Sequence, residues 1–558
     1  MPNQAPIVCL IEAGECAKSC FQGWKYFLGK YKDNVIPIFI SSSGYGEVGK
    51  MSSWLYTDSR LTESLNLSSV NSDVSDGIQN YINSIDYGSI LKKSQHLSYS
   101  KITNEVELTN EYVHSLQYRN IYIGRYIASH LIRFCPELVA KFHPDRNHLR
   151  GCLRNIYCYL LLIDQLQSYC TIKFSFFTET VYLGGALVEY LNSIGTTLPF
   201  IYYKQPVTLK STQCLNSFKG KSLVYQALEH RFHLFELNAS GLTETQKYLI
   251  QLSGKNILEQ RIRSVYKLNS KSDASSEKNV WEFFQLAAFQ PERILQAEEE
   301  CNSLLKDGRQ TFILYLHCFA DGPYWEGYSG YATSYQYFSH FAALLSSLSS
   351  VVREPPRILI KPHPNIINGF SSPFPHDQEK AQQDLDNTLA LLNQISSNSD
   401  IECFLVNPFI NNSIFLDKDK DDLAAVHVTH HGSVGLEALY RGKKLICSDC
   451  AVYAGLGFGE IVLTPAAKSE DIIKELDRNK NRIPYDPERI EVFAGLEEFY
   501  SEFDVNSAIS KFTRTTYSQA LLERMPTGER SSTELNAIEE NLISRYVEKV
   551  RDRLEKEV

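Results

Sequence analysis

The sequence predicts an α/β protein made of two successive doubly wound halves. Its 558 residues exceed what one hydrophobic core usually holds, so two large domains are expected. Short apolar segments alternate with amphipathic ones, which is typical of parallel sheets with helical connections. This alternation stops at the polar residues 268–279 and then starts again. We therefore expect one α/β domain over residues 1–267, a second over residues 281–500, and a charged helical segment over residues 501–558 that could pack back on the first domain.

Apolar runs predict the strands of the first half, each with the loop that follows it. These runs occupy residues 6–15, 34–46, 172–180 and 197–206. The amphipathic residues 16–31 and the residues 181–195, which end in a glycine, predict helices between the strands. Loops that follow parallel strands lie at the carboxyl edge of the sheet, so ligands are expected there.

The second half repeats this pattern. A charged helix is expected over residues 291–308 and a longer one over residues 378–396. Strands with their exit loops are expected at residues 311–319, 357–364, 401–408, 424–432 and 444–449. The resulting fold class is α/β, with two Rossmann-like domains that face each other across a cleft.

Charge and composition exclude several classes of protein. The net charge is −9 with acidic and basic residues interspersed, whereas a nucleic-acid partner would require a basic face. The N-terminus lacks the pattern of a signal peptide, and the apolar runs are too short to span a bilayer. We expect a cytoplasmic protein that could contact the inner membrane peripherally. The thirteen cysteines are scattered, and the CxxC pair at residues 447–450 has no second pair, so we expect reduced thiols and no metal site.

The stretch HVTHHGSVGLEALYRGKKLI, residues 427–446, places polar and small residues where a strand gives way to a helix. Ser433 stands at the expected helix start, with Gly432 and Gly435 leaving room beside it. Backbone N–H groups at such a start can bind a phosphate. The alternative is that Ser433 is only an N-cap residue. Gly442 is expected to end the helix.

Two further side chains of this stretch are candidates for nucleotide binding. Glu437 lies four residues after Ser433, on the same helix face, where a carboxylate could accept from two ribose hydroxyls. The alternative is a helix residue that faces solvent. His431 precedes the glycine of the turn and is included in the candidate binding set.

A second strand exit has the sequence RILIKPHPNI, residues 357–366. Here the strand ends in Lys361, and prolines on both sides of His363 restrict its backbone. An ammonium and an imidazole N–H can both donate to a phosphate. The alternative is a proline-rich exit loop, ending in Pro364, with an incidental histidine.

The KPHP element, the HHGSVGLEALYRGKK element and VYAGLGF at residues 452–458 together resemble the C-terminal half of bacterial capsule-polysaccharide transferases of the Kps type. This family includes Kdo transferases. Sialyl- and polysialyltransferases and the polyol-phosphate polymerases of teichoic acid synthesis carry similar elements. The resemblance covers about residues 311–460, and all of these families have the GT-B fold.

The resemblance implies roles for individual residues. His363 and Ser433 would contact the donor phosphate, while Glu437 and the Lys361–Pro364 loop would hold the nucleotide. Polyol-phosphate polymerases usually carry an aspartate soon after their serine pair, and this chain has Ser-Val-Gly-Leu-Glu instead. A CMP-activated sugar would be the donor substrate, with neither cofactor nor metal required.

Glycosyl transfer also requires a carboxylate on the acceptor side, as general base or as nucleophile. Glu179, at a strand exit of the first half, is the favoured candidate, with Glu12 and Glu15 as alternatives. Glu179 could instead only stabilise a helix N-terminus. Asp321 lies in an aromatic loop over residues 316–335 that could bind a sugar or a base, or simply pack on itself.

The expected function is transfer of an acidic sugar, Kdo or a related ulosonic or sialic acid, from a CMP-activated donor. The acceptor would be a surface polysaccharide or a glycolipid. Two alternatives remain: a polyol-phosphate transferase that uses a CDP-alcohol, and a non-catalytic component of polysaccharide assembly.

Overall fold

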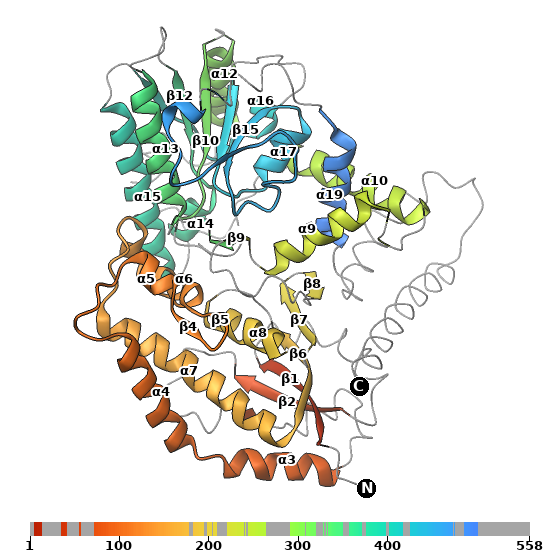
Figure 1. The fold of residues 1–558 in the computed structure, drawn as a ribbon. Coiled ribbons are helices and arrows are strands. Elements are labelled where there is room, and N and C mark those ends of the chain that lie inside the picture. The colour runs from red at the N-terminus through yellow and green to blue at the C-terminus, as the bar shows by residue number, and fades with distance from the viewer. Residues whose placement is uncertain are drawn as a thin grey trace.

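The computed structural model describes most of the two halves of the chain (Figure 1). Every structural statement below refers to the described residues. They are residues 5–13, 35–41, 55–56, 72–177, 182–194, 198–203, 205–208, 220–221, 223–238, 240, 244–263, 291–306, 309–319, 327–328, 331, 333–349, 356–370, 375–397, 401–416, 425–472, 474 and 485–499.

The first half contains a six-stranded sheet in the order β3-β2-β1-β6-β7-β8. Its strands are β1 (Ile7–Ala13), β2 (Val35–Ser41), β3 (Leu55–Tyr56), β6 (Thr171–Phe177), β7 (Leu198–Tyr203) and β8 (Gln205–Thr208). The four central strands pair in parallel, and the edge strands β3 and β8 pair antiparallel to their neighbours. The predicted strands are confirmed, whereas the short edge strands were not predicted.

A helical region lies between β3 and β6 in the sequence. It comprises α3 (Ser72–Ser84), α4 (Tyr87–Lys101), α5 (Asn110–His114), the hairpin β4 (Gln117–Tyr118) and β5 (Ile121–Tyr122), α6 (Gly124–Phe134), η2 (Pro136–Val139) and α7 (Arg146–Tyr169). Helix α8 (Tyr182–Ile194) follows β6 as predicted. Helix α7 lies beside the sheet, and α4 packs along its outer side (Figure 1), so all residues of α7 from 156 to 163 are buried.

The second half contains a six-stranded, entirely parallel sheet in the order β13-β12-β10-β14-β15-β16. Its strands are β10 (Thr311–Tyr315), β12 (Arg357–Lys361), β13 (Glu402–Leu405), β14 (Ala425–Thr429), β15 (Lys444–Ser448) and β16 (Ile461–Leu463). The central three are buried on both faces, as expected for a sheet covered by helices on each side. The predicted α/β class with two Rossmann-like halves is confirmed.

Helices connect these strands on both faces. They are α12 (Pro291–Leu305), α13 (Ser334–Ser349), α14 (Asn365–Phe370), α15 (Pro375–Ser396), α16 (Ser413–Leu416), α17 (Val434–Tyr440) and α19 (Pro487–Phe499). Gly442 follows α17 with φ +67°, which confirms its predicted role in ending that helix.

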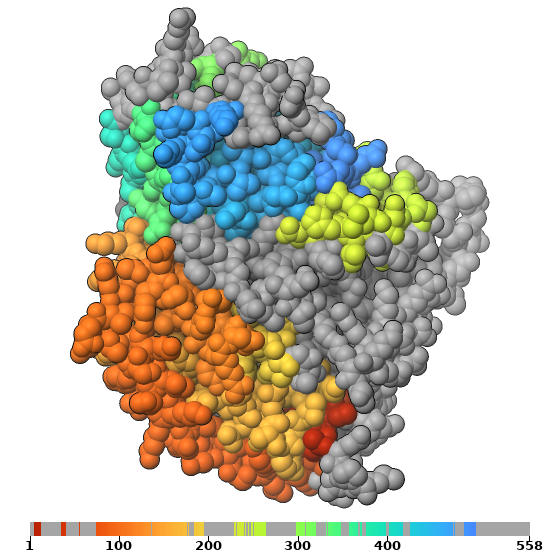
Figure 2. Space-filling view, in the orientation of Figure 1, coloured from red at the N-terminus to blue at the C-terminus, as the bar shows by residue number. Residues whose placement is uncertain are grey.

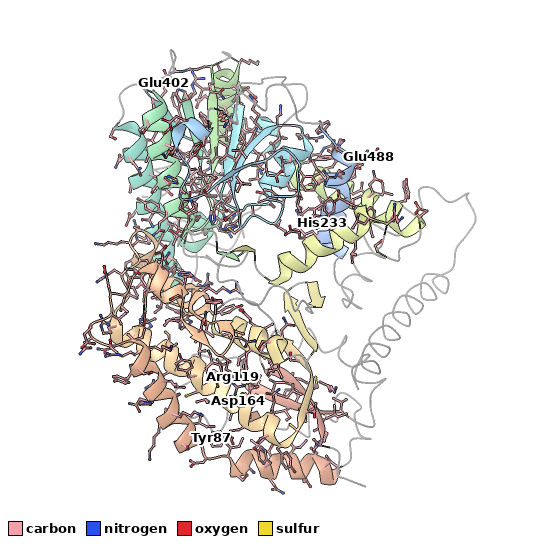
Figure 3. The ribbon with its side chains drawn as sticks, in the orientation of Figure 1. Tyr87, Arg119, Asp164, His233, Glu402 and Glu488 are labelled. Atoms are coloured by element: carbon pink, nitrogen blue, oxygen red, sulfur yellow. The ribbon has the colours of Figure 1, made fainter. Side chains whose placement is uncertain are left out.

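The carboxyl edge of the second sheet faces the first half. Glu402, at the amino end of β13, lies at the far side of the molecule in Figure 3, and α14, directly after β12, lies next to the first half in Figure 1. The Thr333 hydroxyl donates to the Val139 carbonyl over 2.9 Å, and β9 (Gly220–Lys221) pairs with β11 (Gly327–Tyr328). Figure 2 shows the two halves as adjoining masses.

Helices α9 (Leu223–Glu236) and α10 (Glu244–Arg263) pack on the second half, although the predicted boundary at residue 267 placed them in the first domain. Arg441 on the turn after α17 forms a bidentate pair with Glu259 of α10, at 2.8 and 2.9 Å. Gln251 of α10 donates to Glu491 of α19. His233 and Glu488 mark this group of helices in Figure 3. The predicted segment 501–558 lies outside the described residues.

Three further observations concern the helices, the cysteines and the possible metal ligands of the described residues. None of the helices in the described ranges is long and apolar enough to cross a membrane. The cysteines there, including Cys447 and Cys450, form no disulfide. Within the same ranges, His, Cys, Asp and Glu side chains form no cluster suited to a metal ion.

The crossing of α10 and α19 depends on two glycines. A Cβ on Gly254 would lie 1.7 Å from the Glu491 carbonyl oxygen, and one on Gly495 would lie 2.0 Å from that of Ile250. The obstructing atoms belong to the backbone, so a side chain can be accommodated only if a helix moves. Close contact between the helices therefore requires glycine at both positions.

We expect Gly254→Ala to lower the free energy of unfolding by about 1–3 kcal/mol, the usual effect of overpacking. Gly151→Ala in α7 is the matched control, because a Cβ there meets no atom within 4 Å. The control should be neutral or stabilising, since alanine favours a helix. Urea unfolding measures both variants, and equal effects would contradict the close crossing.

Candidate functional site

A cavity of about 250 Å³ lies at the carboxyl ends of β10, β12 and β14. This is where the topology of a parallel sheet places a ligand site. The lining residues are Arg261, Tyr315, Leu316, His317, Lys361, Pro362, His363, Pro364, Pro408, Phe409, Ile410, Asn412, Thr429, Gly432, Ser433, Val434 and Glu437. The two strand exits selected from the sequence thus open into one cavity.

The register of the sheet brings the strand ends together. Tyr315 pairs with Lys361 on one side and with Thr429 on the other, so three adjacent strands end at the same level. The chain then turns at Pro362 and Pro364. Between them the His363 ring accepts the Asn365 N–H at Nδ1 over 3.1 Å, which fixes the ring.

A chain of hydrogen bonds links the charged groups of the cavity. The Lys361 ammonium donates to Asn412 Oδ1 over 2.9 Å. Asn412 Nδ2 donates to Glu437 Oε2 over 3.4 Å, and the Ser433 hydroxyl donates to Glu437 Oε1 over 3.5 Å. The buried lysine and the buried glutamate therefore share one amide.

Burial shifts the pKa values of both groups toward their neutral forms. It lowers the pKa of Lys361 to about 8, against an opposing effect of the Glu437 carboxylate. It also raises the pKa of Glu437, an effect opposed by the charges of Arg261 and Lys361 and by hydrogen bonds from Asn412 and Ser433. Near pH 7 the lysine is charged and has lost much of its hydration. Such a cation interacts strongly with an anion that enters the cavity.

His363 is neutral at physiological pH, because burial and the neighbouring His317 and Lys361 lower its pKa to about 3. Since Nδ1 accepts the Asn365 amide, the proton of the neutral ring lies on Nε2. His363 can therefore donate an N–H without carrying a charge. Its ring lies 5.3 Å from that of His317, which in turn lies 4.8 Å from that of His431.

The turn before α17 differs from the expectation in two respects. Ser433 is exposed and makes no side-chain cap hydrogen bond, so the simple N-cap alternative is wrong. Gly435 leaves room for a protein side chain instead of a ligand, because a Cβ there would lie 1.9 Å from the Tyr453 hydroxyl oxygen. That hydroxyl donates to the Gly432 carbonyl, which holds the turn in place.

The other residues selected from the sequence differ in where the structure places them. Glu437 is only 3 % exposed and faces the cavity, so the alternative of a solvent-facing helix residue is wrong. His431 is buried and is not among the residues that line the cavity. Glu179 and Asp321 lie outside the described residues, as does Glu15. Glu12 is the last residue but one of β1, and its Oε1 lies 4.0 Å from the place that a Cβ on Gly184 would take.

The polar lining residues Asn412, His317 and Arg261 were not selected from the sequence. Asn412 belongs to the loop after β13, so the rule that ligands bind at strand exits could have suggested it. His317 follows β10 directly and could have been selected in the same way. Arg261 reaches the cavity from α10, far from any strand exit, and no signal in the sequence marks it.

No protein-family model matches the chain, and no curated protein matches it either. Among solved structures it is similar to the UDP-forming alpha,alpha-trehalose-phosphate synthase from Burkholderia vietnamiensis, with 11 % identity over 94 % of this chain and 99 % of that chain and a TM-score of 0.30. It is also similar to the alpha,alpha-trehalose 6-phosphate synthase from Burkholderia multivorans, with 12 % identity, coverage of 93 % and 100 %, and a TM-score of 0.30. A third similar structure is Anabaena HepE in complex with UDP, with 9 % identity, coverage of 92 % and 100 %, and a TM-score of 0.25. Likenesses of this size assign neither a family nor a substrate.

The lowered pKa of Lys361 predicts a dependence of stability on pH. The folded state releases the lysine proton near pH 8, whereas the unfolded state keeps it up to its ordinary pKa of 10.5. The unfolded state thus binds more protons in this window, and stability rises with pH there, by up to about 3 kcal/mol. In Lys361→Met this contribution should be absent. Urea unfolding of both proteins between pH 7.5 and 10 measures the difference, and parallel curves would contradict the assignment.

Proposed function

We propose that this protein is a GT-B glycosyltransferase that binds the nucleotide part of an activated sugar in the cavity of its second half. One observation carries the proposal: a buried lysine and a buried glutamate line the same cavity at the carboxyl ends of parallel strands. The lysine suits a phosphate and the glutamate suits a pair of hydroxyls, and a nucleotide offers both.

The leaving group of such a donor is a nucleotide that gains negative charge as the glycosidic bond breaks. The Lys361 ammonium can neutralise part of this charge, and the neutral His363 can donate Nε2–H to a phosphate oxygen. Ser433 supplies a hydroxyl at the same edge of the cavity. These groups are fixed before the ligand enters, so little reorganisation accompanies the reaction. A metal ion is not required for this stabilisation.

The Glu437 carboxylate has acceptor capacity beyond its two protein hydrogen bonds. Each of its oxygens accepts one bond, from Ser433 or from Asn412, and a carboxylate has about four acceptor sites. Two adjacent ribose hydroxyls can use the remaining sites. Burial strengthens these bonds because water does not compete for them.

We infer that the donor is a CMP-activated acidic sugar, Kdo or a related ulosonic or sialic acid. The resemblance of the two strand exits to Kps-type transferases supports this choice. The cavity is smaller than the roughly 300–1,000 Å³ of typical ligand sites, which suits a leaving group with a single phosphate. The sugar would extend toward the first half, where the acceptor, a surface polysaccharide or a glycolipid, would bind. A glycolipid acceptor would bring the protein to the inner membrane.

A nucleotide panel tests the assignment of the site. We expect CMP and CDP to raise the melting temperature more than UDP, GDP or ADP at equal concentration. Lys361→Met should weaken binding of CMP about 10- to 100-fold, since hydrogen bonds to charged groups contribute about 1.5–3 kcal/mol. Lys468→Met, an exposed lysine of the same half, is the control and should bind as the wild type does. Stabilisation by UDP or ADP alone would contradict the CMP assignment.

The affinity for CMP should also depend on pH. Because the pKa of Lys361 is about 8 in the free protein, the charged fraction of the lysine falls above that pH, and affinity should fall with it. Isothermal titration calorimetry from pH 6.5 to 9.5 measures the profile. The decline should be absent in Lys361→Met, whereas a decline of equal size in that variant would assign it to another group.

Product analysis separates the proposal from its two alternatives. Incubation with CMP-Kdo and an oligosaccharide or glycolipid acceptor should release CMP and add the mass of Kdo. Release of CMP from CDP-glycerol with transfer of glycerol phosphate would establish the polyol-phosphate alternative instead. A non-catalytic assembly component would give neither product, and cells carrying Lys361→Met would then keep their polysaccharide.

A further inference from the structure

The loop between β13 and α16 places one asparagine between the two charged groups of the cavity. Asn412 Oδ1 lies 2.9 Å from Lys361 Nζ, and Asn412 Nδ2 lies 3.4 Å from Glu437 Oε2. Among the described residues, Lys361 and Glu437 form no direct ion pair, although each contributes to the electrostatic potential at the other. The Asn412 amide thus lies between two groups, Lys361 and Glu437, that could otherwise form a salt bridge.

An amide is suited to this position because its two ends differ. The ammonium of Lys361 only donates, and the ionised carboxylate of Glu437 only accepts, so the group between them must accept on one side and donate on the other. Asparagine meets both requirements. Aspartate of the same shape could accept from the lysine but would repel the glutamate, and leucine could do neither.

The backbone of this loop is held from several directions. The Asn411 side chain donates to the Arg263 carbonyl at the end of α10, and its Oδ1 accepts the Ser413 N–H. Asn407 Oδ1 accepts the Phe409 N–H. The Asn412 carbonyl accepts the Phe415 N–H in the first turn of α16. Asn412 is therefore positioned by its loop and not by the ligand.

We propose that Asn412 is a positioning residue of the donor site, which holds Lys361 and Glu437 apart so that the ammonium faces the phosphate and the carboxylate faces the ribose. The identity of this ligand rests on the proposed function, whereas the separation of the charges does not. Two of the three ammonium protons of Lys361 have no hydrogen-bond partner among the described residues. A direct ion pair with Glu437 would use the groups that the ligand needs.

The pKa of Lys361 depends on the groups around it, so it can be used to test the role of Asn412 without any bound nucleotide. The charged and titratable groups that face Lys361 come from different elements: Glu437 of α17, Cys301 of α12, His363 of the exit turn and Arg261 of α10. A change at residue 412 replaces none of these residues, but it also alters the hydrogen bond that Glu437 accepts from Asn412. A shift of the lysine pKa in a variant of Asn412 therefore reports on the linked groups Lys361, Asn412 and Glu437 together.

The test compares Asn412→Asp with Asn407→Asp, the same change in the same loop at a residue that does not line the cavity. Trace acetylation with acetic anhydride between pH 6 and 11, read by mass spectrometry of the Lys361 peptide, gives the lysine pKa. We expect Asn412→Asp to raise this pKa of about 8 by at least one unit, which lowers the neutral, reactive fraction of the amine at pH 8 at least about fivefold. Asn407→Asp should titrate as the wild type does. Equal titration of Lys361 in all three proteins would overturn the proposal.

Asn412→Leu tests the effect on ligand binding. It keeps the size of the side chain and removes both hydrogen bonds, so CMP affinity should fall at least tenfold while Asn407→Asp retains it. Unchanged CMP affinity in Asn412→Leu would overturn the positioning role. If the wild type binds no nucleotide, the proposed function fails, and the acetylation experiment still decides whether Asn412 controls the lysine.

Discussion

The register of the second sheet places the last residues of three parallel strands at one level, and the candidate site follows from this alignment. Tyr315, Lys361 and Thr429 end β10, β12 and β14 side by side. A shift by one residue would turn Lys361 to the other face of the sheet, since side chains alternate along a strand. Most of the preceding residue pairs are buried and apolar, and they fix this register, so the hydrophobic core determines where the charged groups lie.

Burial gives Lys361 and Glu437 properties that they would lack at the surface. A lysine in water is strongly hydrated and binds phosphate weakly, whereas Lys361 has an exposed fraction of 8 % and a lowered pKa. Burial likewise raises the pKa of Glu437. The Asn412 amide forms one hydrogen bond with each group and neutralises neither. The site thus keeps two opposite charges available in a small cavity, at a cost to stability.

The packing of α10 on the second half completes the cavity. Close contact at Gly254 and Gly495 joins α10 to α19, and the bidentate pair of Arg441 with Glu259 joins it to the turn after α17. Arg261 lies two residues after Glu259 on α10 and lines the cavity. Helices α9 and α10 follow the first sheet in sequence but pack on the second half. The domain boundary predicted at residue 267 therefore does not match the packing.

The sequence by itself determined the α/β class, the central strands and the two strand exits with Lys361, His363, Ser433 and Glu437, because apolar periodicity and the rule of strand exits are local. The antiparallel edge strands, the filling of Gly435 by Tyr453 and the neutral state of His363 depend on residues distant in sequence. Asn412 and Arg261 entered the site only through the tertiary structure. Local patterns specify which segments become strands and helices, whereas packing between distant segments decides which polar groups share a cavity and how burial sets their charge.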